Sequence, residues 1–227
     1  MKQFRQKQAR PKKTSLIIGR IAVLTALQEG KELERVYMQS TLQGDVAEEI
    51  KRIALKRNVP VNKVPVEKLN SFNVPNHEGV IALISKVQYQ DLQNVVSFIT
   101  EKGEAPLLLM LDGITDIRNI GGIARTAYCC GVHAIIIPEK GVGTLNEDAI
   151  LTSAGALEKI AVCRVNSLMK AVDDLHLNGI KVYASEMTAS TTIDNVDFSE
   201  PCCIIMGGEE NGIYPALMKI CDDKIKI

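Results

Sequence analysis

Residues 107–137 read LLLMLDGITDIRNIGGIARTAYCCGVHAIII, and this stretch decides the fold. An apolar run at each end flanks a polar loop and a helical pattern. Short apolar runs without polar alternation are typical of strands buried on both faces, and parallel strands need a long connection such as a helix. The stretch therefore predicts a strand, a helix and a second, parallel strand.

The same alternation continues towards the end of the chain. Further apolar runs, separated by helical segments, read IAVCRV (160–165), IKVYAS (180–185) and CCIIMG (202–207). We therefore predict an α/β fold in which helices cover both faces of a parallel sheet. Ligands bind beyond the carboxyl ends of such strands, so chemistry is expected in the loops after Leu111, Pro138, Ala184 and Met206.

Residues 14–87 have a shorter, more mixed pattern, which predicts a separate compact α/β unit. Residues 88–104 are polar and partly amphipathic, so we expect a connector and a helix that lies over the following domain, residues 105–227. Residues 1–13 hold six Lys or Arg and no acidic residue, although the formal net charge of all 227 residues is zero. Such a basic arm suits an RNA backbone, because neutralised phosphates release counterions, and a solubilising tail is the alternative.

Composition argues against several other classes. No apolar run approaches the roughly 18 residues of a membrane span, and Arg20 interrupts the N-terminal apolar segment that a secretory signal would need. The six cysteines form no C-x-x-C pair and the three histidines are scattered, so we expect no metal site and reduced cysteines, mostly in the core. These features indicate a cytoplasmic protein without a membrane partner.

Residues 119–125, NIGGIAR, place two glycines at the start of the predicted helix, where each costs roughly 0.5–1 kcal/mol relative to alanine. Asn119 is a candidate N-cap, and Gly122 and Gly121 lie three and four positions before Arg125. One explanation is a ligand that needs bare backbone beside Arg125. The other is close packing of the helix, and the pattern alone leaves both open.

A second candidate site follows CCIIMG, where Gly207 and Gly208 lead into Glu209 and Glu210. A phosphate-binding loop would need a lysine there, so no polyphosphate ligand is expected. Carboxylates beside backbone amides suit a nucleoside or a positively charged sulfonium; the alternative is an acidic helix start stabilised by the helix dipole. A third patch, within residues 141–159, is interpreted as helix capping and packing, and a ligand site is the alternative.

In combination, LDGITDIRNIGGIARTA, GVHAIIIP, TSAGALEKIAV and IIMGGEENGI closely resemble the SpoU, or TrmH-type, branch of the SPOUT RNA methyltransferases. Upstream, LIIGRIAVLTAL and NHEGVIALI resemble the ribosomal-protein-like substrate domain of ribosomal RNA ribose methyltransferases in this branch. The resemblance runs from about Leu16 to the end. It is closest to the group that methylates guanosine 2′-hydroxyls in 23S ribosomal RNA.

The resemblance implies S-adenosylmethionine as methyl donor and a ribose 2′-hydroxyl of structured RNA as acceptor, in ribosomal RNA more than in transfer RNA. It also implies a C-terminal trefoil knot and a homodimer with its active site at the subunit interface. Matched position by position, the catalytic residues would be Arg125, Asn119 and Glu209. The adenosine pocket would be lined by the backbone at Met206, Gly207, Ile227, Ala184 and Ser185.

Arg125 would stabilise the developing oxyanion electrostatically, since arginine stays protonated in proteins. Asn119 would orient Arg125 or the ribose, and Glu209 would fix the guanidinium or the nucleoside. In the family, a proline and a loop with a Ser-Leu-Asn triplet follow the position of Ile227, where this sequence ends. We therefore expect either a truncated form of a longer protein or a chain with an incomplete cofactor pocket. A non-catalytic RNA-binding protein is the alternative function, and an α/β enzyme that uses NAD or ATP is a weaker one.

Overall fold

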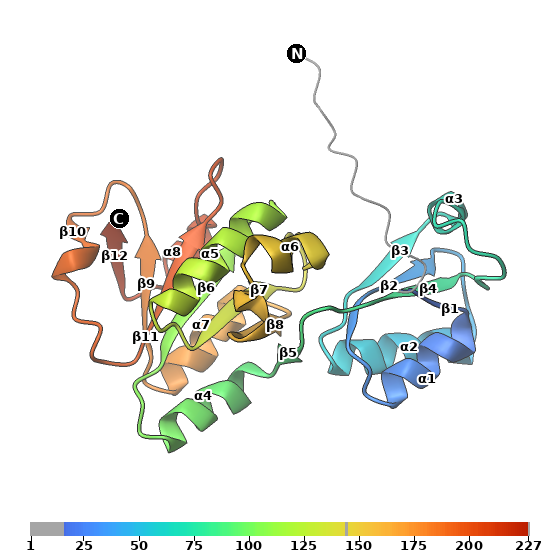
Figure 1. Ribbon diagram of the computed structural model, residues 1–227, viewed down its shortest axis with the longest axis horizontal. Coiled ribbons are helices and arrows are strands. Elements are labelled where there is room, and N and C mark those ends of the chain that lie inside the picture. The colour runs from blue at the N-terminus through green and yellow to red at the C-terminus, as the bar shows by residue number, and fades with distance from the viewer. Residues whose placement is uncertain (1–15, 144, 227) are drawn as a thin grey trace, which may run out of the picture. The chain divides into compact units, whose positions relative to one another are not determined.

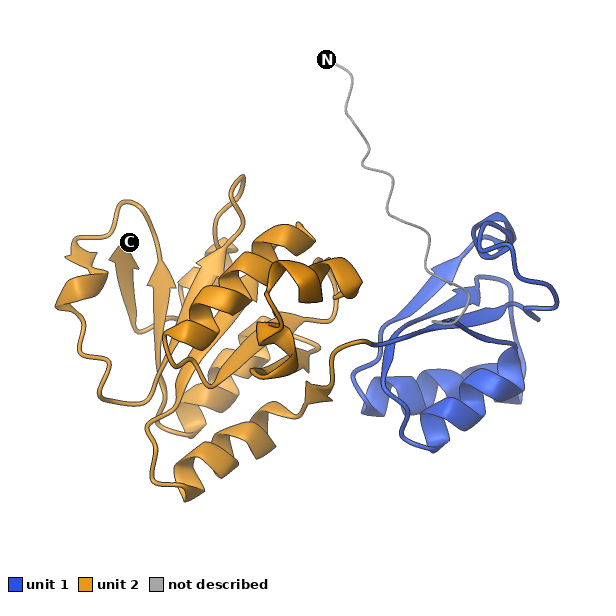
Figure 2. Cartoon of the chain, in the orientation of Figure 1, with its two compact units in different colours: residues 1–85 blue, residues 86–227 orange. Residues whose placement is uncertain are grey.

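The computed structural model describes residues 16–143 and 145–226 (Figure 1). The chain divides between Ser85 and Lys86 into two compact units (Figure 2). Each unit has its own sheet and its own hydrophobic core. The basic arm, residues 1–13, and Ile227 lie outside the described residues.

The first unit is a four-stranded sheet with the order β1-β4-β2-β3. Its strands are β1 (Leu16–Ile18), β2 (Leu33–Gln39), β3 (Val61–Val64) and β4 (Val80–Ile84). The β2 and β3 strands are parallel, and the other pairs are antiparallel. Helices α1 (Arg20–Gln28) and α2 (Asp45–Lys56) contribute to one core, and the short α3 (Val66–Asn70) contributes Leu69 to a second, smaller one.

The second unit is an eight-stranded sheet with the order β10-β12-β9-β11-β6-β7-β8-β5, and all its neighbouring strands are parallel. Five strands match the predicted apolar runs: β6 (Leu107–Asp112), β7 (Ala134–Pro138), β8 (Ala161–Val165), β9 (Lys181–Ser185) and β11 (Cys202–Gly207). The predicted parallel sheet is therefore confirmed. Three strands escape the sequence pattern because they are too short to show periodicity: β5 (Tyr89–Gln90), β10 (Thr191–Thr192) and β12 (Asp223–Lys226).

Helices cover both faces of this sheet, as predicted (Figure 1). One face carries α4 (Leu92–Glu101), α7 (Leu168–Leu177) and α8 (Pro215–Met218). The other carries α5 (Ile117–Cys129), α6 (Glu147–Thr152) and the 3-10 helix η2 (Ala156–Glu158). A further 3-10 helix, η3 (Ile193–Asn195), follows β10. Side chains of β6 such as Met110 and Leu111 point alternately into the two cores, which explains why this strand has no polar face.

Because all strands are parallel, their carboxyl ends meet at one edge of the sheet. The register pairs Asp112 at the end of β6 with Gly207 at the end of β11, and Ile205 of β11 with Ala184 of β9. The loops that follow these three strands therefore start side by side. This edge carries the loops in which the sequence predicts the chemistry.

None of the helices within residues 16–143 and 145–226 combines the length and apolar character that crossing a bilayer requires. All six cysteines are free. Three of them, Cys163, Cys202 and Cys203, are buried, as expected for core residues, and Cys221 is partly buried. Cys129 and Cys130 are exceptions to the mostly buried set, because they are exposed where α5 ends on the surface.

Candidate active site

The loop after β11 folds back tightly on its own first residue. A Cβ atom added to Gly207 would lie 2.1 Å from the carbonyl carbon of Gly212 and 2.3 Å from the nitrogen of Ile213. The amide of Gly212 donates a 2.8 Å hydrogen bond to the carbonyl of Gly208, and Gly212 has a φ of +63°, which favours glycine. This closed turn holds Glu209 at its exposed tip.

The same loop is fastened to the end of β6. The backbone amide of Tyr214 donates a 2.7 Å hydrogen bond to Oδ2 of Asp112. A Cβ atom on Gly208 would lie 2.7 Å from the carbonyl oxygen of Gly113, so the two loops touch through their backbones. Sequence reasoning missed Asp112, because an acid at a strand end carries no pattern that marks a contact about a hundred residues away.

The turn presents Glu209 to the first turn of α5. The side-chain amide of Asn119 donates a 2.8 Å hydrogen bond to Oε1 of Glu209. Both side chains are exposed, so the bond is accessible to a ligand at the carboxyl edge of the sheet. Two of the three predicted catalytic residues are thus in direct contact.

The predicted N-cap of α5 is wrong. The helix begins at Ile117, and its N-cap is Asp116, whose Oδ1 accepts a 2.8 Å hydrogen bond from the amide of Arg118. Both Asp and Asn are good N-caps, and the segment TDIRN contains one of each, three positions apart. Because Asp116 caps the helix, the side chain of Asn119 is free to reach Glu209.

The two glycines of NIGGIAR have different explanations. Gly121 is buried, and a Cβ atom there would lie 2.8 Å from Cβ of Thr152 and 2.9 Å from the carbonyl oxygen of Ala149 in α6. Gly121 therefore allows close packing of α5 on α6. Beyond the backbone of α5 itself, no described atom lies within 4 Å of a Cβ added to Gly122, so packing against another element does not explain this second glycine.

Arg125, the third predicted catalytic residue, is exposed on α5. Its side chain makes no hydrogen bond or ion pair with any residue that the structure describes. It follows Gly122 by three positions, so both lie on one side of the helix. The structure brings Asn119 and Glu209 together and places Arg125 six positions after Asn119 on α5, with its charge available.

The third patch consists of capping and packing residues, as expected. Oδ1 of Asn146 accepts hydrogen bonds from the amides of Asp148 and Ala149 and so caps α6. The Ser153 side chain is fully buried, donates to the carbonyl of Ile150 and accepts from the amide of Leu157. The Ser153 hydroxyl and Oδ1 of Asn146 are thus both engaged within the protein.

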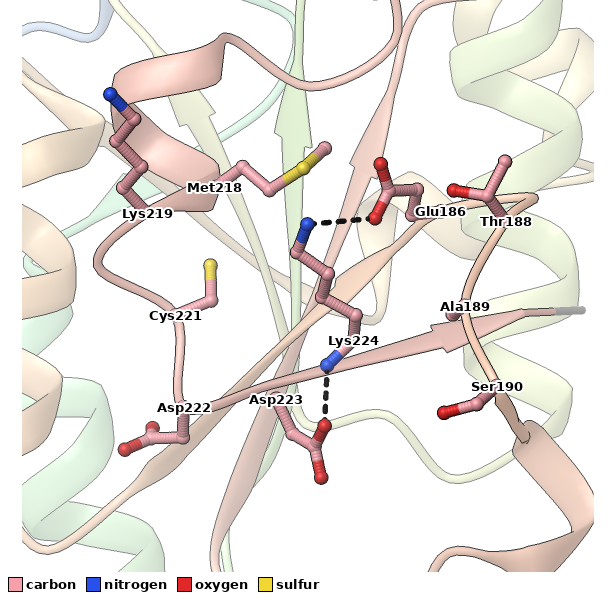
Figure 3. Close-up of a pocket in the computed structure, with 10 residues that line it drawn as sticks. All are labelled: Glu186, Thr188, Ala189, Ser190, Met218, Lys219, Cys221, Asp222, Asp223 and Lys224. Carbon is pink, nitrogen blue, oxygen red and sulfur yellow. Dashed lines mark hydrogen bonds and ion pairs between the residues drawn. The ribbon is translucent and has the colours of Figure 1, made fainter.

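The residues predicted to line an adenosine pocket lie at two neighbouring strand ends. Ala184 and Ser185 end β9, and Met206 and Gly207 end β11. A hollow of about 600 Å³ lies next to the end of β9, and its lining includes Glu186, the residue after Ser185 (Figure 3). Its lining does not include Met206 or Gly207 and consists of Glu186, Thr188, Ala189, Ser190, Met218, Lys219, Cys221, Asp222, Asp223 and Lys224.

The hollow is polar on both sides. Figure 3 shows Lys224 between two acids, with its Nζ 2.9 Å from Oε2 of Glu186. Hydroxyl groups of Thr188 and Ser190 add donors and acceptors at its rim. Among the residues that the structure describes, no group of three His, Cys, Asp or Glu side chains is placed to hold a metal ion.

Comparisons with family models cover both units. Residues 106–227 match the SpoU rRNA Methylase family. Residues 16–90 match a model described as RNA 2′-O ribose methyltransferase substrate binding. The two models together account for most of the described chain.

Known relatives cover nearly the whole chain as well. The chain is 31% identical to YacO of Bacillus subtilis (strain 168), named as a TrmH-family tRNA/rRNA methyltransferase, over 93% of this chain and 85% of the relative. It is 33% identical to a protein of Staphylococcus aureus (strain MSSA476) with the same family name, over 94% of this chain and 86% of the relative.

Solved structures share the fold. The SpoU methyltransferase AviRb from Streptomyces viridochromogenes, in complex with the cofactor AdoMet, superposes with a TM-score of 0.55 at 21% identity, over 93% of this chain and 79% of that one. An rRNA methyltransferase from Sinorhizobium meliloti gives a TM-score of 0.54 at 21% identity, over 93% and 78%. These likenesses place the α/β fold, with its preceding small unit, among known architectures.

Proposed function

The chain belongs to the SpoU family of RNA methyltransferases, and from this membership we propose that it transfers the methyl group of S-adenosylmethionine to a ribose 2′-hydroxyl of structured RNA. The observation that carries the proposal is the 2.8 Å hydrogen bond between Asn119 and Glu209. It joins the helix after β6 to the loop after β11, at the edge where parallel sheets bind ligands.

Three side chains would act on the RNA. Methyl transfer would form a bond between the 2′-oxygen and the methyl carbon and break the bond from that carbon to the sulfonium sulfur, which would leave as a neutral thioether. The 2′-hydroxyl would give its proton to water, so its oxygen would develop negative charge before the new bond is complete. Arg125, which has no ion-pair partner among the described residues, would stabilise that charge and the neighbouring phosphate. Asn119 would orient the ribose, and Glu209 would hold the Asn119 amide in place.

The residues at the strand ends fit an adenosine with a sulfonium. When bound, S-adenosylmethionine supplies an electrophilic methyl group. The closed turn packs its own backbone against Gly207 at the end of β11, so no side chain fits at that position. Backbone at Ser185, Met206 and Gly207 would hold the adenosine. The carboxylate of Glu186 and the hydroxyls of Thr188 and Ser190 offer partners for hydroxyl, amino or positively charged groups next to it.

We further propose ribosomal RNA as the substrate, in preference to transfer RNA, with residues 16–85 as the RNA-binding unit. The match of residues 16–90 to the substrate-binding model supports the role of this unit in RNA binding, and the preference for ribosomal RNA rests on the family resemblance alone. A cytoplasmic homodimer with an active site shared between two copies is proposed from the family resemblance. The knot and the guanosine specificity remain predictions on the same basis.

The test is methyl transfer by the purified chain. RNA from cells that lack the gene is incubated with the protein and radiolabelled S-adenosylmethionine, and the modified nucleotide is located by mass mapping. The expected result is one ribose methylation, formed about 10²-fold more slowly by Glu209→Ala. Calorimetry with S-adenosylmethionine separates the alternative: RNA binding without cofactor binding or methyl transfer would make the chain a non-catalytic RNA-binding protein.

A further inference from the structure

One side of α5 carries two arginines with a glycine between them. Arg118, Gly122 and Arg125 follow the spacing i, i+4, i+7, which places them in one row along a helix. The opposite side of the helix is the buried one, with Ile120, Ala124 and Ala127 in the core. We call Arg118, Gly122 and Arg125 the arginine row; both of its arginines are exposed.

The two guanidinium groups of the row have no partner within residues 16–143 and 145–226. The side chains of Arg118 and Arg125 make no hydrogen bond or ion pair with any residue in the described part of the chain. By contrast, Arg52 makes two hydrogen bonds to Glu49, and Arg57 donates to the carbonyls of Leu27 and Gly30. The row therefore presents two positive charges, about 10 Å apart along the helix axis, that form no ion pair with the described residues.

The two acidic residues that hydrogen-bond to the first turn of α5 already have these partners. Asp116 accepts the amide of Arg118 as the N-cap, and Glu209 accepts the side chain of Asn119. Gly122 leaves a clear space between the two arginines, because an added Cβ there has no neighbour within 4 Å. A ligand with more than one negative charge and an exposed backbone suits this surface.

We propose that the arginine row binds the RNA backbone, with Arg118 contacting a second phosphate besides the one near Arg125. A guanidinium forms paired, charge-assisted hydrogen bonds with phosphate oxygens, and Gly122 lets the sugar-phosphate chain approach the helix. The inference rests on the proposed function, since it takes RNA as the ligand. It assigns Arg118 to binding only, whereas Arg125 also stabilises charge at the reacting oxygen.

The first experiment measures RNA affinity of the full chain against salt concentration. Arg118→Ala should weaken binding about tenfold and reduce the slope of log K against log salt by about 0.7 to 0.9, the loss expected for one phosphate contact. Arg118→Lys should keep the slope, because the charge remains, but lose part of the affinity. In methyl transfer, Arg118→Ala should raise KM with kcat within about twofold of the parent.

The matched control is Lys170→Ala. Lys170 is an exposed cation in the first turn of α7, on the opposite face of the sheet. Like Arg118→Ala, the Lys170→Ala substitution removes one positive charge from an exposed position in the first turn of a helix. A general effect of net charge on RNA binding would therefore appear in both variants. We expect its salt slope to equal that of the parent chain.

A second variant blocks the row without removing charge. Gly122→Leu places a side chain in open space on the surface and replaces a poor helix former, so the fold should be at least as stable as the parent. RNA affinity should nevertheless fall, because the added side chain occupies the path of the RNA backbone. A melting temperature and an RNA titration on the same sample separate the two effects.

Several outcomes would overturn the inference. An Arg118→Ala slope equal to that of Lys170→Ala would remove Arg118 from the RNA interface. A shift in dimer dissociation by sedimentation, with an unchanged salt slope, would instead assign the row to a second copy of the chain. Because RNA binding is measured without cofactor, the absence of methyl transfer would contradict the proposed function alone.

Discussion

The side-chain amide of Asn119 lies 2.8 Å from the carboxylate of Glu209, across 90 positions of sequence. The contact joins two loops that start from neighbouring strands, β6 and β11. Both residues are exposed, so burial does not explain the pairing. It depends on the backbone of the closed turn at Gly207 to Gly212, which sets the position of Glu209.

The first prediction concerns this pair. Asn119→Ala and Glu209→Ala should each lower the rate of methyl transfer by about 10²-fold, the usual scale for one preorganised polar group. If the two residues act as a unit, the double variant should be little slower than either single one. Single-turnover kinetics measure all three, and losses that multiply in the double variant would show that the contact has no catalytic role.

Arg125 should be needed for the reaction but not for the fold. Its side chain has no partner among the described residues, so Arg125→Ala should melt within about a degree of the parent. Its kcat should fall by about 10²-fold or more, with little change in affinity for S-adenosylmethionine. Calorimetry and single-turnover assays check both halves. A variant that keeps its rate would leave Arg125 as a surface cation.

The two glycines of NIGGIAR should respond oppositely to alanine. Gly122→Ala meets no atom within 4 Å and should stabilise the fold by about 0.5–1 kcal/mol through helix propensity. Gly121→Ala would bring Cβ to 2.8 Å from Cβ of Thr152, so it should destabilise by about 1–3 kcal/mol. Urea unfolding of the two variants gives both values, and equal signs would contradict the packing described for α5 and α6.

The contrast between Gly121 and Gly122 separates the features that the sequence predicts from those that depend on packing. The apolar runs predict five of the eight strands of the second sheet, because a strand buried on both faces has to be apolar throughout. The same pattern predicts which loops meet at the carboxyl edge. It does not separate Gly121 from Gly122, because the difference lies in the position of α6, which only the packed structure determines.

The partners of polar side chains are the other feature that the sequence does not predict. The choice between Asp116 and Asn119 as N-cap depends on one turn of helix, and both residue types are suited to it. The family resemblance indicates Asn119 and Glu209 as site residues without showing that they touch. Nothing in the sequence pairs Asp112 with Tyr214, because a backbone amide leaves no trace in residue type.

Thiol labelling should separate the cysteines into two groups. Burial raises the pKa of Cys163 to about 12 and raises that of Cys203 further above its usual range, so both stay neutral thiols at pH 8. Cys129 and Cys130 are exposed and should react with iodoacetamide within minutes under native conditions. Mass spectrometry with and without urea locates the labels. Native labelling of Cys163 or Cys203 would show that the core opens readily.

Substitution of Asp112 tests whether this residue positions the loop that carries Glu209. Asp112→Ala leaves the amide of Tyr214 without its 2.7 Å acceptor, which costs about 1–3 kcal/mol locally if the amide finds no water. The loop should loosen, hydrogen exchange at the Tyr214 amide should speed up, and kcat should fall because Glu209 is no longer held against Asn119. The affinity for RNA should change much less, since the arginine row on α5 is untouched.

Asp112→Asn is the matched variant, because its amide oxygen still accepts a hydrogen bond while the charge is lost. We expect it to restore both slow exchange at Tyr214 and most of the rate. If Asp112→Asn protects the Tyr214 amide but remains as slow as Asp112→Ala, the negative charge of Asp112, rather than its hydrogen bond, is what the reaction requires. In that case Asp112 would act directly at the carboxyl edge, beside Gly207, and not through the loop.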